Sequence, residues 1–167
     1  MTVLQIRTLG DPVLRQTCAP VERFDGWLRS TADDLFETMY AAPGVGLAAN
    51  QVGIAMRFFV YDDGDGRKGF VANPELSDLA GTDTIDEGCL SIPGPFSATP
   101  RALRVYLRGQ DLSGGTFDLR AQGLLARIFQ HETDHLNGGL YVDRLDDVGR
   151  RDVMRQLREL ELKRAGS

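Results

Sequence analysis

Residues 123–138 read Gly-Leu-Leu-Ala-Arg-Ile-Phe-Gln-His-Glu-Thr-Asp-His-Leu-Asn-Gly and carry the strongest structural signal in this chain of 167 residues. Within them, large apolar side chains recur at helical spacing, at Leu124, Leu125, Ile128, Phe129 and Leu136. A glycine stands at each end, where it interrupts the helical pattern. We therefore expect one amphipathic helix that is largely buried.

The same helix carries a His-Glu-x-x-His pattern formed by His131, Glu132 and His135. Side chains four residues apart project from one face of a helix, so both imidazoles can contact one cation. Glu132 then stands beside the metal, where it can take a proton from a bound water without being a ligand. The chain has only these two histidines. The plainer alternative is two core histidines that happen to fall four residues apart.

A catalytic metal site usually has three protein ligands and one position open to water. One metalloprotease pattern has a histidine at position 141, which is Tyr141 in this chain. The candidates for the third ligand are therefore Cys89 and the carboxylates. Cys89 precedes Pro93-Gly94-Pro95, which we expect to turn the chain and aim the thiol at one point. Thiolate is a strong ligand for zinc and iron, so Cys89 is the best candidate.

The composition is that of an ordinary soluble globular protein, with 42% hydrophobic and 26% charged residues. Its length predicts one domain over residues 1–167. A net charge of −5 argues against a general nucleic-acid binder. Residues 1–7 lack the apolar run of a signal peptide, and no other stretch approaches a bilayer span. With two cysteines, a disulfide framework is not expected, so we predict a cytosolic protein.

The rest of the chain predicts short strands between separate helices. A helix should follow Asp25 as its N-cap and stop at Pro43 and Gly44. A second should span residues 147–164, with an apolar stripe at Val148, Val153, Met154, Leu157 and Leu160. Strand signals fall at residues 57–61, 69–72, 84–87, 103–108 and 116–119. The pattern predicts an α+β fold with short mixed or antiparallel strands packed around the central His-Glu-x-x-His helix.

Three stretches of the chain are distinctive when taken together: residues 44–51 (Gly-Val-Gly-Leu-Ala-Ala-Asn-Gln), 87–91 (Glu-Gly-Cys-Leu-Ser) and 130–135 (Gln-His-Glu-Thr-Asp-His). In order and spacing they resemble the three signature motifs of peptide deformylases. Alone, residues 44–51 would be interpreted as a tight turn between a helix and a strand. The resemblance covers essentially the whole chain. After Ser91, Gly94-Pro95-Phe96 stands in a stretch where some members carry an arginine that reaches the substrate.

The resemblance implies an enzyme that removes the formyl group from the N-terminal formylmethionine of newly made bacterial proteins and releases formate. It implies that Cys89, His131 and His135 hold one divalent metal, commonly Fe²⁺, with Zn²⁺ or Ni²⁺ as replacements. Metal-bound water would attack the formyl carbon, with Glu132 as general base and then general acid. The Gln51 side-chain amide and the Leu90 backbone N–H would meet the oxyanion.

The resemblance also implies that the substrate lies as an added strand, between Val45 and Gly46 on one side and Gly88 on the other. The methionine side chain would enter an apolar slot, for which resemblance and helix geometry nominate Val45, Ile85, Leu124 and Ile128, with Arg127 at the rim. The plain alternative for these apolar residues is core packing. For Leu125 and Phe129 we prefer core packing.

The partners implied are N-formylmethionyl nascent peptides, with no DNA and no membrane. Arg151, Arg155 and Arg158 fall at helical spacing in the C-terminal segment, which predicts either a solvated face or a surface that docks on ribosomal RNA. Two rival functions are a minimal zinc endopeptidase and a non-catalytic Cys-His-His metal module. The second rival requires a fourth protein ligand to close the metal shell.

Overall fold

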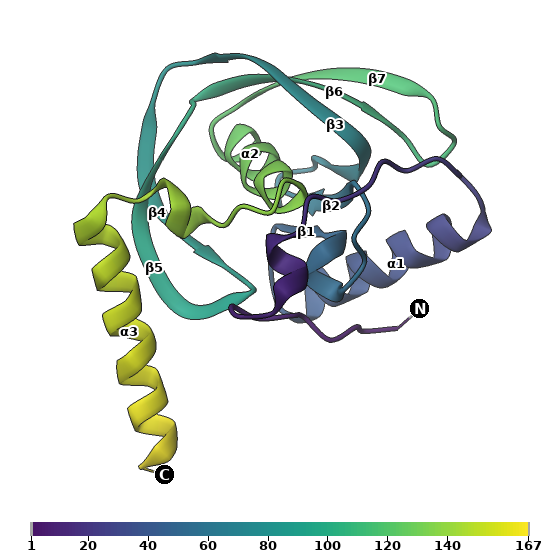
Figure 1. The fold of residues 1–167 in the computed structure, drawn as a ribbon. Helices are drawn as coiled ribbons and strands as arrows, with labels where there is room; N and C mark the ends of the chain where they lie inside the picture. The colour runs from purple at the N-terminus through teal and green to yellow at the C-terminus, as the bar shows by residue number, and fades with distance from the viewer. Residues whose placement is uncertain (1, 167) are drawn as a thin grey trace.

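A computed structural model describes residues 2–166, which contain three α-helices and seven β-strands, and the strands form two antiparallel sheets (Figure 1). The helices are α1 (Gly26–Ala41), α2 (Leu124–Leu136) and α3 (Asp147–Ala165). The strands are β1 (Gly46–Ala48), β2 (Phe58–Asp62), β3 (Lys68–Ala80), β4 (Asp83–Cys89), β5 (Ile92–Arg101), β6 (Arg104–Gln110) and β7 (Thr116–Gln122). The predicted α+β class and the central helix are confirmed.

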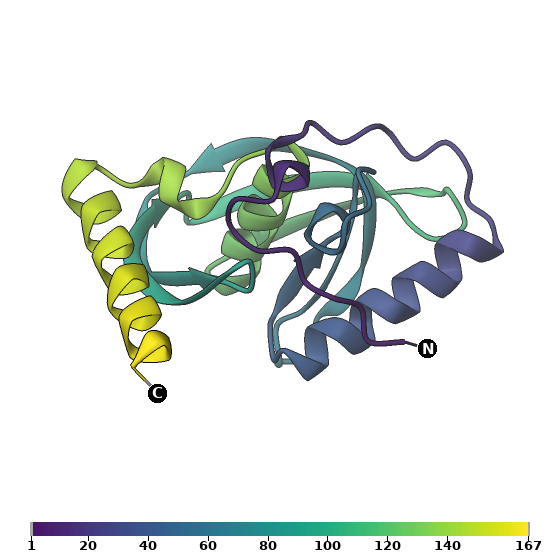
Figure 2. The ribbon, with the colours of Figure 1, turned by 60° about the horizontal axis from the view of Figure 1, so that its bottom comes forward.

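The sheets surround α2. Five strands lie in the order β1-β2-β3-β6-β7, and β4 pairs with β5 as a separate hairpin. In Figure 1 the five-stranded sheet curves over α2, while β4 and β5 close its other side. α1 and α3 lie at opposite ends of the molecule (Figure 2). The central helix is therefore enclosed by strands from three sides.

Burial explains why α2 forms the centre, since ten of its 13 residues are buried. Phe129 is fully buried, and its ring centroid lies 5.0 Å from that of Tyr61 and 6.1 Å from that of Phe59. Leu125 belongs to the same cluster, as expected for a core residue. A helix that is buried nearly all round needs partners on several sides, and the curved sheet and the β4–β5 hairpin provide them.

The strand β2 is covered on both faces because its side chains alternate between two cores. Phe59 and Tyr61 point to α2, whereas Phe58 and Val60 pack with α1 residues such as Leu35. Helix α1 begins where predicted, since the Asp25 carboxylate accepts a hydrogen bond from the Leu28 N–H at 3.1 Å. This cap satisfies one of the otherwise unpaired N–H groups of the first turn.

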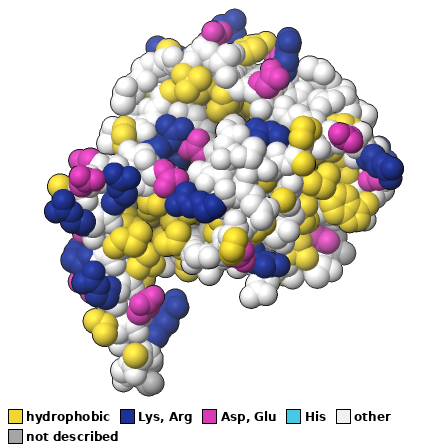
Figure 3. Space-filling model, in the orientation of Figure 1, with side chains coloured by type: hydrophobic (Ala, Val, Ile, Leu, Met, Phe, Trp, Pro, Cys, Tyr) yellow, Lys and Arg dark blue, Asp and Glu magenta, His cyan; other side chains and the backbone are white. Residues whose placement is uncertain are grey.

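Helix α3 docks through a narrower stripe than the sequence predicted. Val153 is fully buried and Leu157 packs against the same cluster, but Val148 is 71% exposed and Met154 is 42% exposed. The reason is that α3 contacts mainly β5 and the short helical turn at Tyr141–Arg144 that precedes α3, so only one face of α3 is covered. Lys and Arg side chains gather along its exposed side (Figure 3). Within residues 2–166, no helix has the length and apolarity that a membrane span needs.

Two strands were not predicted. Pro93-Gly94-Pro95 was expected to turn the chain, but it lies inside β5. Prolines fit there because β5 pairs only with β4, so its other edge makes no ladder bonds that a missing N–H would break. Residues 44–51 were interpreted as a turn, yet they contain β1, which is too short to show an alternating pattern. The predicted strand at 69–72 extends to Ala80, past Asn73 and Asp78, whose positive φ angles of 50° and 51° accompany irregular pairing.

Candidate active site

Three potential metal ligands meet where β4 ends beside α2. Cys89 is the last residue of β4, and His131 and His135 lie on consecutive turns of α2. Their ligand atoms all lie within 4.8 Å of one another. The Cys89 Sγ is 3.4 Å from the His135 Nε2, which is 3.1 Å from the His131 Nε2. The structure thus brings together the three residues that the sequence predicted as ligands, and no carboxylate joins this cluster within the described residues.

The chemistry of this cluster fits a divalent transition metal. One thiolate and two imidazoles suit Zn²⁺ or Fe²⁺, and three protein ligands leave a position free. The Nδ1–H of His131 donates to the Glu87 carboxylate at 2.6 Å, which leaves its Nε2 facing the other two ligand atoms. Metal-binding histidines are usually oriented in this way. Burial holds the pKa of His135 well below its ordinary value, which favours the neutral imidazole that a metal ligand needs.

Glu87 is held by two arginines, of which sequence reasoning had connected Arg127 with the site but not Arg101. Arg101 donates to both of its carboxylate oxygens, at 3.0 and 2.6 Å, and Arg127 donates at 2.7 Å. All three side chains are buried. Burial alone would raise the pKa of Glu87, but the hydrogen bonds from His131 and Arg101 hold it far below the ordinary value. Glu87 therefore stays ionised and anchors His131.

Arg127 was expected at the rim of the methionine slot. It lines the cavity, but its guanidinium is buried and also donates to the backbone carbonyls of Thr99 and Asp83, at 2.9 and 2.7 Å. The physical reason is the charge on Glu87, because a buried carboxylate needs a cation beside it. Sequence patterns could not reveal this ion pair, since Arg127 and Glu87 lie 40 residues apart in the chain. Only the Glu87-Gly88-Cys89 motif could have pointed to this carboxylate.

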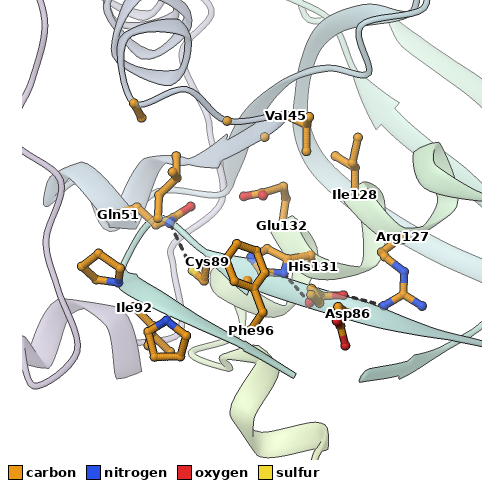
Figure 4. A pocket seen from close by; sticks show the side chains of 18 of the residues that line it. Val45, Gln51, Asp86, Cys89, Ile92, Phe96, Arg127, Ile128, His131 and Glu132 are labelled. Carbon is orange, nitrogen blue, oxygen red and sulfur yellow. Dashed lines mark hydrogen bonds and ion pairs between the residues drawn. The ribbon is translucent and has the colours of Figure 1, made fainter. Parts of the chain in front are cut away.

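Glu132 is buried, and one of its carboxylate oxygens, Oε2, has no hydrogen-bond partner among the described residues. Figure 4 shows the carboxylate above Cys89 and His131. Burial raises the pKa of Glu132 to about 7, against the lowering effect of His131. β1 comes very close here, because a Cβ on Gly46 would lie 2.6 Å from the Glu132 Oε1. A carboxyl group in this state can accept and return a proton near neutral pH.

The Gln51 amide is fixed beside Cys89. Its Oε1 accepts from the Ala48 N–H at 2.9 Å, and its Nε2 donates to the Ser91 hydroxyl at 3.0 Å. The same Nε2 lies 3.7 Å from the Cys89 Sγ. Sequence reasoning named Gln51 but missed Ser91, whose hydroxyl helps to hold the amide in one orientation. Leu90, between Cys89 and Ser91, lines the same space.

These groups open onto one cavity of about 630 Å³ (Figure 4). Every residue that the sequence predicted for substrate binding lines it: Val45, Gly46, Ile85, Gly88, Leu124, Arg127 and Ile128. Gln51, Leu90, Cys89, His131 and Glu132 line it as well, whereas His135 is fully buried behind them. Ile128 is 3% exposed, while Val45, Ile85 and Leu124 are 44–47% exposed. The cavity therefore has a polar floor and largely apolar walls.

Comparison with known proteins relates this chain to one family. The family model described as polypeptide deformylase matches residues 3–151. The peptide deformylase of Halothermothrix orenii is 47% identical over 151 residues, which cover 89% of this chain and 97% of the relative. That of Acidothermus cellulolyticus is 49% identical over 161 residues, covering 96% and 89%. The crystal structure of a peptide deformylase from Legionella pneumophila matches with a TM-score of 0.92 and 38% identity, covering 99% of both chains.

The two cysteines allow a matched test of the metal centre. Cys89→Ala removes a proposed ligand, so the purified chain should bind metal far more weakly, with less than one equivalent after dialysis. Cys18→Ala removes a buried thiol of the α2 core and should keep one equivalent. Elemental analysis of both variants and the parent measures this. Full metal content in Cys89→Ala, or loss of metal in Cys18→Ala, would contradict the ligand assignment.

Proposed function

Since the chain belongs to the polypeptide deformylase family of metal-dependent hydrolases, we propose that it removes the N-formyl group from the N-terminal formylmethionine of newly synthesised proteins and releases formate. The observation that carries this proposal is the meeting of Cys89, His131 and His135 beneath the buried carboxyl group of Glu132. We propose that residues 1–167 act as one catalytic domain and that it works in the cytoplasm.

Cys89, His131 and His135 would hold one divalent metal, which we propose to be Fe²⁺, with Zn²⁺ or Ni²⁺ as substitutes. When bound, such an ion polarises the formyl carbonyl and makes water a better nucleophile at neutral pH. The rival non-catalytic module needs a fourth protein ligand, and the cluster holds three within residues 2–166. This count supports an open, catalytic site.

The remaining chemistry falls to side chains of the cavity floor. Glu132 would take the proton of the attacking water and return it to the departing amine, a role that its raised pKa supports. The Gln51 Nε2–H and the Leu90 backbone N–H would donate to the developing oxyanion. Because Ser91 and Ala48 already hold the Gln51 amide, little reorganisation is needed during reaction. Removing one such donor typically lowers the rate about a hundred- to a thousandfold.

The substrate would enter as an extended strand between Val45 and Gly46 of the β1 segment and Gly88 of β4. Its methionine side chain would reach Ile128 past Val45, Ile85 and Leu124, all of which line the cavity. An unbranched thioether suits an apolar slot of this kind. We assign Arg127 to the wall behind the slot, where it supports Glu87.

We also propose that α3 contacts ribosomal RNA, which would bring the site near emerging chains. Arg155 is paired with Asp152 at 2.5 Å and with Glu159 at 2.8 Å, so its charge is locally balanced. Arg151 and Arg158 are exposed and form no ion pair with a described residue. They are seven residues apart and thus share one face of α3. Of the three arginines predicted to form a docking surface, Arg151 and Arg158 therefore remain.

Glu132→Gln should lower kcat for formate release from a formyl-Met dipeptide by about a hundred- to ten-thousandfold, because the proton acceptor is lost. The metal content should stay at one equivalent, since Glu132 is not a ligand. The exposed Glu75→Gln is the matched control and should keep full activity. A folded Glu132→Gln variant without metal would make Glu132 a ligand, and a metal-loaded parent that releases no formate would overturn the proposed function.

Ile128→Ala should reduce the preference for methionine over alanine at the first residue. Lost apolar contact of this size shifts discrimination by about 1–3 kcal/mol, roughly ten- to two-hundredfold in the ratio of kcat/KM values. Leu125→Ala is the control, because Leu125 is buried in the core and is not among the cavity residues. An unchanged ratio in Ile128→Ala would place Ile128 in the core and off the substrate.

Arg151→Glu with Arg158→Glu should abolish co-sedimentation with ribosomes at low salt and leave formate release from a free peptide unchanged. Arg23→Glu with Arg29→Glu is the control of equal charge change, since both arginines are exposed and lie far from α3 along the chain. Co-sedimentation equal to that of the parent, or equal loss in both double variants, would contradict docking through α3.

A further inference from the structure

The outer edge of β5 is closed by one side chain of α3. The Gln156 Nε2 donates to the Phe96 carbonyl at 3.1 Å, and the Phe96 N–H donates to the Gln156 Oε1 at 3.3 Å. These are the two hydrogen bonds that a residue of a neighbouring antiparallel strand would exchange with Phe96. An amide side chain can make both because it carries one acceptor and two donors.

Gln156 is itself held in place. Its Nε2 also donates to Asp152, one turn earlier on α3, at 2.8 Å, and Asp152 accepts from Arg155. One turn later, the Leu160 side chain packs against Gly94 and occupies the space that a Cβ on this residue would need. Gln156 and Leu160 thus contact β5 from consecutive turns of α3.

Phe96 lies at the substrate cavity. It lines the cavity and is 61% exposed. Its ring covers Gly88, because a Cβ on Gly88 would lie 2.7 Å from the Phe96 Cε1. Gly88 directly precedes the proposed ligand Cys89. Figure 4 shows the ring in front of Cys89 and His131, away from Ile128.

Because the Phe96 ring is largely exposed, its position depends strongly on that of its own main chain. The Phe96 main chain lies on the edge of a two-stranded sheet, where nothing but Gln156 pairs with it on the outer side among the described residues. A peptide whose methionine reaches Ile128 and whose backbone lies along Gly88 would bring its next side chain to this ring. An aromatic ring at that point suits an apolar or aromatic side chain.

We propose that Gln156 is a positioning residue for substrate binding, which fixes the Phe96 main chain so that the ring forms a platform for the residue after formylmethionine. This proposal rests on the proposed deformylase function. It makes the affinity for peptides longer than formylmethionine depend on a residue of α3, outside the three signature motifs. Catalytic groups are untouched, so the effect belongs to KM and not to kcat.

The test compares Gln156→Leu with the parent, because leucine has a similar size and forms no hydrogen bond. Metal-loaded proteins are assayed with formyl-Met-Phe-amide and with formyl-Met-amide, which lacks the following residue. For the longer substrate KM should rise about three- to tenfold, the size expected for lost hydrogen bonds at a partly exposed site. The kcat value and the KM for formyl-Met-amide should stay unchanged. Glu161→Leu is the control on α3, because the Glu161 side chain is exposed and forms no hydrogen bond with a described residue, and it should behave like the parent.

A double-mutant cycle separates positioning from a general effect on the fold. In a Phe96→Ala background, Gln156→Leu should have no further effect on KM, because the platform is already gone. The same KM in Gln156→Leu and the parent would overturn the proposal. A rise of KM in Gln156→Leu that is equal for both substrates would also overturn it. So would a rise of KM on adding Gln156→Leu to the Phe96→Ala variant. A parent that releases no formate from either substrate would remove the proposed function itself and this inference with it.

Discussion

The structure depends on one buried carboxylate. Glu87 of β4 accepts hydrogen bonds from Arg101 at the end of β5 and from Arg127 and His131 on α2. A buried charge is stable only when it is paired, and removing one partner of such a cluster typically costs about 3–5 kcal/mol. Glu87 therefore ties the β4–β5 hairpin to the central helix. The same bonds orient His131, so the packing of the hairpin also sets the geometry of the candidate metal site.

Hydrogen bonding of the central helix α2 is incomplete at the candidate site. Four of its side-chain atoms are buried and lack partners among the described residues: the Arg127 Nε, the Glu132 Oε2, the Thr133 Oγ1 and the His135 Nδ1. Buried polar atoms are paired in the great majority of cases, so this concentration of exceptions on one helix supports a functional site there. The surrounding apolar core, with Phe129 fully buried, holds these groups in place. Rigidity of the core and reactivity of the site thus come from the same 13-residue helix.

Local patterns in the sequence predicted the features that depend on interactions between residues close together in the chain. Helical periodicity and the His131-Glu132 pattern identified α2, and the Asp25 cap identified the start of α1. Cys89 followed from the shortage of histidines. The strand β5 was not predicted because it contains prolines, which are excluded from central strands but tolerated in edge strands. Whether a strand lies at an edge depends on tertiary pairing, which local sequence does not reveal. The role of Arg101 was missed for a similar reason, since its partner lies 14 residues away in another strand.

X-ray absorption spectroscopy of the zinc-loaded protein tests the proposed metal centre most directly. The arrangement of Cys89, His131 and His135 predicts one sulfur neighbour at about 2.3 Å and two imidazole nitrogens at about 2.0–2.1 Å, with a remaining light-atom ligand from solvent. A first shell without sulfur, with only one imidazole, or closed by four protein ligands would contradict the account.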